Sequence, residues 1–344
     1  MTKKLYLSKQ AVDCRPTEQQ LLLLQAALLQ GEPALAAWRA WRLTADLDQL
    51  PPGGFALLPL LAYNLQAQGV RDSLLDTCQG IYRRTWTQNQ MRLQVVAALL
   101  GQVQATALTP LVTGDLPLAL LHYPAQGLRA IHHLHLTTPA SQAVAMRTQL
   151  TQAGWQPYRT KEDWLARPLL NNHPQRFRQS GDDLTLHLRS LAPSHEDERM
   201  SARLSINGVT APSADATALL LAVCVQGVAD CWRYGAIQWL VDATMLLRSS
   251  AATIDWPRLT AKVARQAAGV RMNAALTTLQ TWVDASIPPA IQQTLATLPV
   301  QPFERWEARL CQRLPGKAGK MIMLWGEWQR QRACSAKVRA LHGS

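Results

Sequence analysis

Histidines gathered in one part of the chain are the side chains best placed to do chemistry. Six of the eight lie between positions 122 and 187. The run Ile131–Leu136 alternates, so its first, third and fifth residues, among them His133 and His135, share one face of an expected strand. A second alternating run, Leu184–Leu188, carries His187. If the three imidazoles converge they would suit Zn²⁺, although a hydrogen-bonded polar cluster is the more common outcome.

Familiar catalytic patterns are missing from the sequence. It has no GxxxxGK[ST], GxGxxG, HExxH or GxSxG motif. Ser190, Ser194 and His195 lie close together along the chain, but nothing in the sequence orients them for catalysis. The candidate functional residues are therefore sought among the histidines and their neighbours.

The composition is that of a folded protein. Of 344 residues, 48% are apolar and 17% are charged, which excludes a disordered chain. No apolar run approaches the roughly 18 residues needed to span a bilayer, and the lysines of the first ten residues precede no apolar segment of a signal peptide. The six cysteines are scattered without a CxxC pair, which indicates reduced thiols and a cytoplasmic location.

Positive charge is concentrated at the C-terminal end. Residues 305–344 hold nine Lys and Arg against two Glu, a net charge of +7 out of +12 for the whole chain. Such a segment attracts polyanions, so weak nucleic-acid binding through 305–344 is one expectation. A solvated basic surface is the alternative.

Apolar periodicity divides the chain into four parts. Helical spacing dominates 1–105 and 211–304, whereas 106–210 holds both alternating runs and one amphipathic segment. The basic, Trp-containing segment 305–344 follows. The predicted fold class is α+β, with a small mixed β-sheet between helical N- and C-terminal parts.

Several short motifs stand in a recognisable order. Gly114 follows an apolar run, Tyr123-Pro124 forms a turn, and Arg129 precedes the first alternating run. Further on, Ile237–Asp242 and Ile254–Trp256 read as a helix and a capped helix start. This frame resembles the uncharacterised nucleotidyltransferase family (NTP_transf_5 type) of the DNA polymerase β-like superfamily. The resemblance implies a nucleotidyltransferase-type sheet.

The residue types at the expected catalytic positions differ from the family pattern. The lysine position is Thr113, and the two positions of the Asp-x-Asp pair are His133 and His135. The third carboxylate position is Thr185, although His187 is kept. Because Mg²⁺ requires anionic oxygen ligands and imidazole suits zinc, copper or nickel, these histidines are no simple replacement for aspartates.

The resemblance therefore favours a catalytically degenerate protein. It would hold a nucleotide, or a peptide or protein partner, in the cleft that serves as the active site in the family. The residues expected to line that cleft are Thr113, Gly114, Asp115, Arg129, His133, His135 and His187. The alternative is an active transferase of non-standard type, using Mg²⁺ and an NTP. It would hold metal with Asp115, Asp182 or Asp183 and steady phosphate with Arg129. A third hypothesis is a nucleic-acid-associated protein that acts through 305–344.

Overall fold

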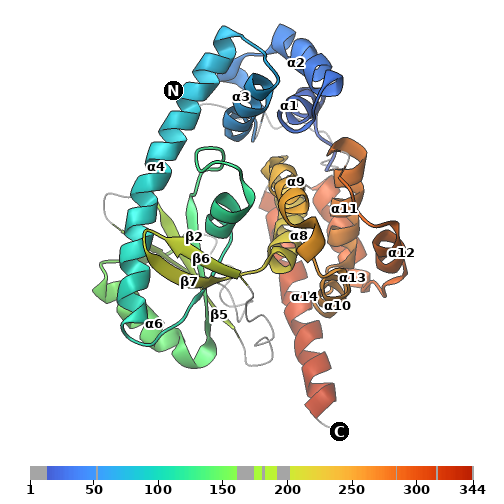
Figure 1. The fold of residues 1–344 in the computed structure, drawn as a ribbon. Coiled ribbons are helices and arrows are strands. Elements are labelled where there is room, and N and C mark those ends of the chain that lie inside the picture. The colour runs from blue at the N-terminus through green and yellow to red at the C-terminus, as the bar shows by residue number, and fades with distance from the viewer. Residues whose placement is uncertain are drawn as a thin grey trace.

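The computed structural model describes residues 14–51, 53–160, 174–179, 183–191, 202–283, 285–314 and 317–342. A seven-stranded mixed sheet lies between N-terminal and C-terminal helices, which confirms the predicted α+β class (Figure 1). No helix among the described residues is long and apolar enough to cross a membrane.

The N-terminal helices follow from local signals in the sequence. Thr17 caps the first helix with a complete capping box, its hydroxyl accepting from the backbone N–H of Gln20 while the Gln20 side chain accepts from that of Thr17. Such a cap typically stabilises a helix by about 1 kcal/mol. The helices of this part are α1 (Glu18–Leu28), α2 (Glu32–Thr44), α3 (Leu58–Ala67) and α4 (Ser73–Gln104).

The C-terminal helices form the other flank of the sheet. Asp215 and Asp255 cap two of them, each accepting from the backbone N–H three residues later. These helices are α8 (Ala216–Tyr234), α9 (Gln238–Ser250), α10 (Trp256–Arg265), α11 (Gly269–Val283), α12 (Pro289–Thr297), α13 (Pro302–Arg313) and α14 (Lys317–His342). They share one hydrophobic core with α1–α3, in which Leu23, Leu61 and Trp232 are buried.

The sheet confirms both predicted strands and adds others. Its strands are β1 (Leu111–Thr113), β2 (His133–Pro139), β3 (Gln156–Tyr158), β4 (Gln175–Arg178), β5 (Thr185–Leu191), β6 (Ala202–Ile206) and β7 (Val209–Ser213), in the order β3-β4-β5-β2-β1-β7-β6. β2 runs parallel to β5, with His133 opposite Thr185 and His135 opposite His187. β1 runs antiparallel to β2 and places Thr113 opposite His135.

One expectation about the first strand is corrected. β2 begins at His133, so Ile131 lies before it and does not share a face with His133. Ile131 is instead fully buried in a second hydrophobic core. An apolar side chain gains more from that core than from the polar face of the sheet.

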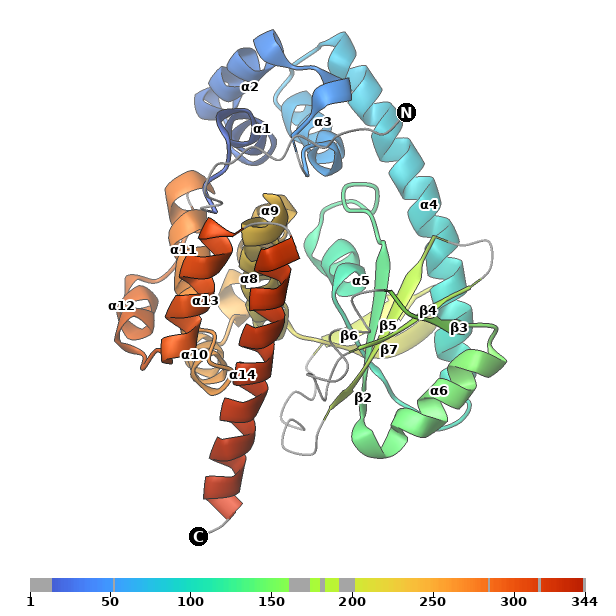
Figure 2. The same cartoon turned by 180° about the vertical axis from the view of Figure 1, so that it is seen from behind.

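The two faces of the sheet differ in chemistry. Leu134 and Leu136 of β2, with Leu186 and Leu188 of β5, pack in the second core beneath α4 and α6 (Ala143–Gln152). The other face carries the residues that alternate with them, and these are polar. This second face is called the polar face below; Figure 2 shows it turned toward the C-terminal helices.

Candidate functional site

Asp115 lies at the edge of the polar face, where β1 ends. Gly114 precedes it with a φ of +74°, a conformation that glycine adopts without strain, and a short helical turn, α5 (Asp115–Pro117), follows. One carboxylate oxygen accepts from the backbone N–H groups of His132 and His133, each at 3.0 Å. The other accepts from the Arg129 guanidinium at 3.0 Å. Both oxygens of Asp115 are therefore hydrogen-bonded to the protein's own donors.

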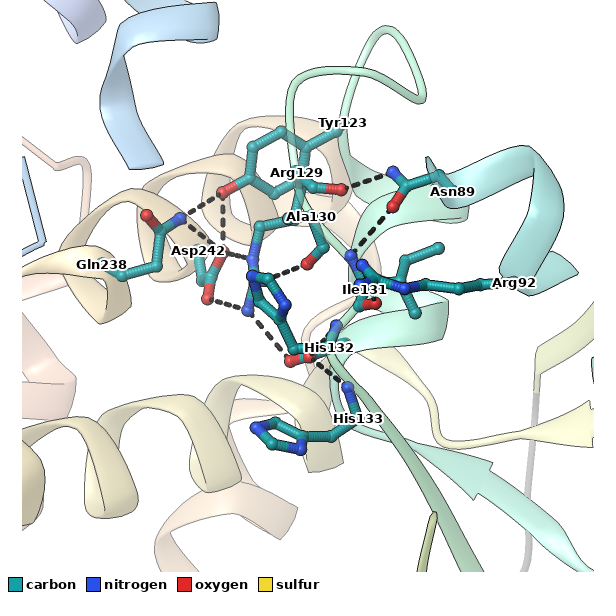
Figure 3. Close-up of polar contacts among 11 residues, drawn as sticks. Asn89, Arg92, Tyr123, Arg129, Ala130, Ile131, His132, His133, Gln238 and Asp242 are labelled. Carbon is teal, nitrogen blue, oxygen red and sulfur yellow. Dashed lines mark hydrogen bonds and ion pairs between the residues drawn. The ribbon is translucent and has the colours of Figure 1, made fainter. Parts of the chain in front are cut away.

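Arg129 joins two distant parts of the chain. Its Nε donates to Oδ1 of Asp242 at 2.9 Å, and Nη2 donates to Oδ2 at 3.1 Å and to Asp115 at 3.0 Å (Figure 3). Asp242 belongs to α9 and is 4% exposed. The guanidinium thus lies between two carboxylates, and its pKa is raised well above the usual value because their charges outweigh the effect of burial.

Tyr123 and Gln238 complete the surroundings of Asp242. The Tyr123 hydroxyl donates to Oδ1 of Asp242 at 2.6 Å, and the Gln238 amide donates to the Tyr123 oxygen at 3.3 Å. Burial and the Asp242 charge raise the pKa of Tyr123 well above its usual range. The turn motif and the α9 motif that pointed to the family therefore meet in one hydrogen-bonded cluster.

Helix α4 holds the loop that delivers Arg129. Asn89 donates to the carbonyl of Arg129 at 2.8 Å and accepts from the backbone N–H of Ile131 at 3.0 Å. Arg92 donates to the Ile131 carbonyl at 2.8 Å (Figure 3). Asn89 is fully buried, so its amide satisfies loop backbone groups that water does not reach. Sequence reasoning did not find Asn89 and Arg92, because a helical sequence does not show which of its polar side chains point into the protein.

The three histidines converge as the alternation suggested. Ring centroids lie 4.7 Å apart for His135 and His187, 5.1 Å for His133 and His187, and 5.9 Å for His133 and His135. His135 packs directly on the Gly114 backbone. Thr185, which the resemblance assigns to the third carboxylate position, lies opposite His133 in the strand register.

The imidazoles of His135 and His187 are neutral near pH 7, because the pKa of each is lowered. Burial, together with the positive charges of His133 and Arg189, lowers the pKa of His135 to about 4 against the attraction of Asp115. Burial, His135, His133 and Arg176 lower the pKa of His187 to about 3. Burial raises the pKa of Asp115, but the charges of Arg129, His133 and His135 lower it by more, so the pKa is lowered overall.

Arginines continue the polar face beyond the histidines. Arg176 of β4 lies opposite His187, and Arg178 lies opposite Thr185. Arg176 donates to the Thr160 hydroxyl at 2.9 Å, and the Arg178 guanidinium lies 5.4 Å from the centre of the Tyr158 ring. Arg189 follows His187 on the same face of β5, opposite Thr137. Among the described residues, β4 and β5 therefore add arginines and no carboxylate to this face.

Metal ligation was a further expectation for this region. Within the part of the chain that the structure describes, no group of three or more His, Cys, Asp or Glu side chains is arranged to hold a metal ion. Asp183 is exposed immediately before β5, and Asp182 lies outside the described residues. The three rings approach one another, but their convergence is not a coordination geometry.

The basic C-terminal segment is built into the helical part of the protein. Cys311 of α13 and Met323 of α14 are buried in the larger hydrophobic core. Arg330 is only 6% exposed and pairs with Glu307 and Glu327. The positive surface of this segment therefore excludes Arg330, which the charge count from the sequence had included.

Solved structures and one family model match this chain. A nucleotidyltransferase-like antigenic protein from Paracoccidioides brasiliensis matches with a TM-score of 0.36 and 12% identity, over 61% of this chain and 93% of that one. JHP933 from Helicobacter pylori matches with a TM-score of 0.29 and 12% identity, over 72% of this chain and 95% of that one. No curated protein matches the chain. A family model described as an uncharacterised nucleotidyltransferase matches residues 56–284 of this chain. Because the match covers more than half of the chain, the chain belongs to this family.

Proposed function

We propose that this protein is a catalytically degenerate member of its family, which binds the phosphate groups of a nucleotide on the polar face without a divalent cation. The observation that carries the proposal is the chemistry at the three family carboxylate positions. His133, His135 and Thr185 stand there, side by side in the register of β2 and β5. None of the three supplies anionic oxygen.

Asp115 does not replace the missing carboxylates. Its two oxygens already accept from Arg129, His132 and His133 at 3.0 Å. Mg²⁺ in nucleotidyl and phosphoryl transfer is usually held by more than one carboxylate together with the substrate phosphates. Releasing Asp115 for that purpose would leave the Arg129 guanidinium with one partner fewer in a mostly buried place.

The arginines of β4 and β5 support anion binding. Arg178 and Arg189 bring two permanent charges to the polar face, and guanidinium groups bind phosphate oxygens in bidentate fashion. Neutral His135 and His187 next to them can donate or accept a hydrogen bond without adding charge. A metal-free phosphate site therefore fits the charge of this face better than a magnesium site does.

The first experiment separates binding from catalysis. Titrations of the full-length protein with ATP, GTP, CTP and UTP should show saturable binding of at least one nucleotide in EDTA, with no strengthening by Mg²⁺. Arg178→Gln should weaken that binding about tenfold, the loss expected for one charge-assisted contact. Arg84→Gln, at an exposed position on α4, is the matched control and should leave it unchanged. Pyrophosphate release at about 1 s⁻¹ or faster with Mg²⁺ would refute degeneracy.

A second experiment restores the family's carboxylates. The triple variant His133→Asp, His135→Asp, Thr185→Asp should gain Mg²⁺ binding, since the register places the three new side chains on neighbouring strands. Mg²⁺ should raise the melting temperature of this variant and leave that of the wild type unchanged. A folded triple variant indifferent to Mg²⁺ would contradict the assignment of these positions.

A further inference from the structure

An apolar groove lies on the outer surface of α13 and α14, away from the polar face. Its volume is about 560 Å³, and it is lined by Trp306 and Leu310 of α13 with Met321, Ile322 and Trp325 of α14. Trp306 is 60% exposed and Met321 is 46% exposed. Single exposed apolar residues are ordinary, but a contiguous set with two tryptophans is typical of a binding surface.

A row of arginines runs along one side of this groove. Arg305, Arg309 and Arg313 are spaced four residues apart on α13 and are all exposed. Arg305 and Arg309 each precede a groove residue, Trp306 and Leu310. The row therefore borders the apolar lining along the length of the helix.

The acidic residues of α13 do not offset this row. Glu304 and Glu307 are 2% and 1% exposed, on the inward side of the helix. Glu307 pairs there with Arg271 of α11 and Arg330 of α14. The helix thus keeps both of its carboxylates inside and all three of its arginines outside, so the border of the groove carries uncompensated positive charge.

We propose that this groove binds an amphipathic, acidic α-helix of a partner protein. Apolar side chains on one face of such a helix would enter between α13 and α14, as helices do in other hydrophobic grooves. Its carboxylates would face Arg305, Arg309 and Arg313. Met321 and the two tryptophans supply the adaptable and aromatic contacts that such grooves use.

Charge and lining argue against two other occupants. A second copy of this chain would bring the same arginine row and would be repelled. Nucleic acid would gain from the arginines and from stacking on the exposed Trp306, but Leu310, Met321 and Ile322, three of the five lining residues, offer bases no stacking surface. The Trp325 ring already packs against another ring of the protein, that of Phe303, in a T-shaped contact with centroids 6.5 Å apart.

The test uses synthetic helical peptides and the full-length protein. One peptide of about 18 residues, five helical turns, carries leucines on one face and glutamates beside them. Its twin has lysine at every glutamate position. We expect saturable binding of the acidic peptide by fluorescence anisotropy, and binding of the lysine twin at least about tenfold weaker.

Two variants and two controls locate the binding surface. Met321→Glu and Arg309→Glu should each weaken binding of the acidic peptide about tenfold or more, and Arg309→Glu should improve binding of the lysine twin. Met91→Glu and Arg84→Glu, the same changes at exposed positions on α4, should leave both affinities unchanged. All four side chains are exposed, so these variants are expected to fold.

Three results would overturn the proposal. One is equal binding of the two peptides, or no binding of either. A second is a single-stranded oligonucleotide that binds more tightly than the acidic peptide and is weakened by Arg309→Glu but not by Met321→Glu. A third is a concentration-dependent dimer, seen by sedimentation, that Met321→Glu dissociates. None of these measurements depends on nucleotide binding at the polar face, so the two proposals can fail separately.

Discussion

The backbone of Gly114 lies against the imidazole of His135 so closely that a Cβ atom at position 114 would be 2.6 Å from Cδ2 of that ring. The same glycine has a φ of +74°. The end of β1 and the histidine of β2 therefore require one another: the ring occupies the space that a side chain would need, and the chain turns there in a way that only glycine adopts without strain.

Gly114→Ala should lower the free energy of unfolding by about 2 kcal/mol or more, from backbone strain and overlap with His135 together. Gly208→Ala separates the two causes, because Gly208 has a φ of +85° but no neighbour within 4 Å of an added Cβ. Its expected loss is about 1 kcal/mol. Urea unfolding measures both; equal losses would show that the contact with His135 does not matter.

Asp242→Asn should cost about 3 kcal/mol of stability, because it removes one partner of a buried ion pair and leaves Arg129 partly uncompensated. Glu32→Gln is the matched control, since Glu32 pairs with Arg39 at the surface with both side chains more than 60% exposed. Its expected loss is below about 1 kcal/mol. Denaturant titrations in which the two variants lose the same amount would contradict a structural role for the Arg129–Asp242 pair.

The histidines of the polar face should make stability depend on pH. The pKa values of His187, about 3, and His135, about 4, lie below the ordinary 6.5, so between those values the folded state binds fewer protons than the unfolded chain. The free energy of unfolding therefore rises with pH in this window and is lost as pH falls from about 7 toward 4.

A double variant, His135→Gln with His187→Gln, tests this sign. It should lose less stability than the wild type between about pH 7 and pH 5, a range that stays above the titration of Asp115, whose pKa is lowered from 3.8. Histidines elsewhere titrate in both proteins, so the slope is expected to decrease, not to vanish. Parallel losses in urea unfolding at the two pH values would refute the assignment.

The sequence predicted the two central strands of the sheet but not β4 or the β6–β7 edge. Ile131–Leu136 and Leu184–Leu188 alternate clearly, because both strands are covered on one face only. β4 was missed, since its four residues include a single apolar side chain, Phe177, too few for a period to appear. β6 and β7 were missed too, although Asn207-Gly208, both with positive φ, is a hairpin turn signal.

The site shows a similar division. Alternation placed His133, His135 and His187 together because strand geometry fixes which side chains share a face. It did not predict that Arg129 would meet Asp242, since the two are 113 residues apart and only the tertiary fold brings them together. The expectation that Arg129 would steady a phosphate likewise ignored Asp115 and Asp242, whose carboxylates hold its guanidinium.

Helix α4 belongs to both hydrophobic cores. Leu75 and Cys78 near its start belong to the larger core, whereas Leu93 and Val103 belong to the core beneath the sheet. Figure 1 shows the helix running from α2 and α3 along the sheet toward α6. A helix transmits order along its length because each turn is bonded to the next. Loss of either core would therefore remove the support of the other and release the Arg129 loop that Asn89 holds midway between them. We therefore expect the arrangement of the polar face to be lost when either core unfolds.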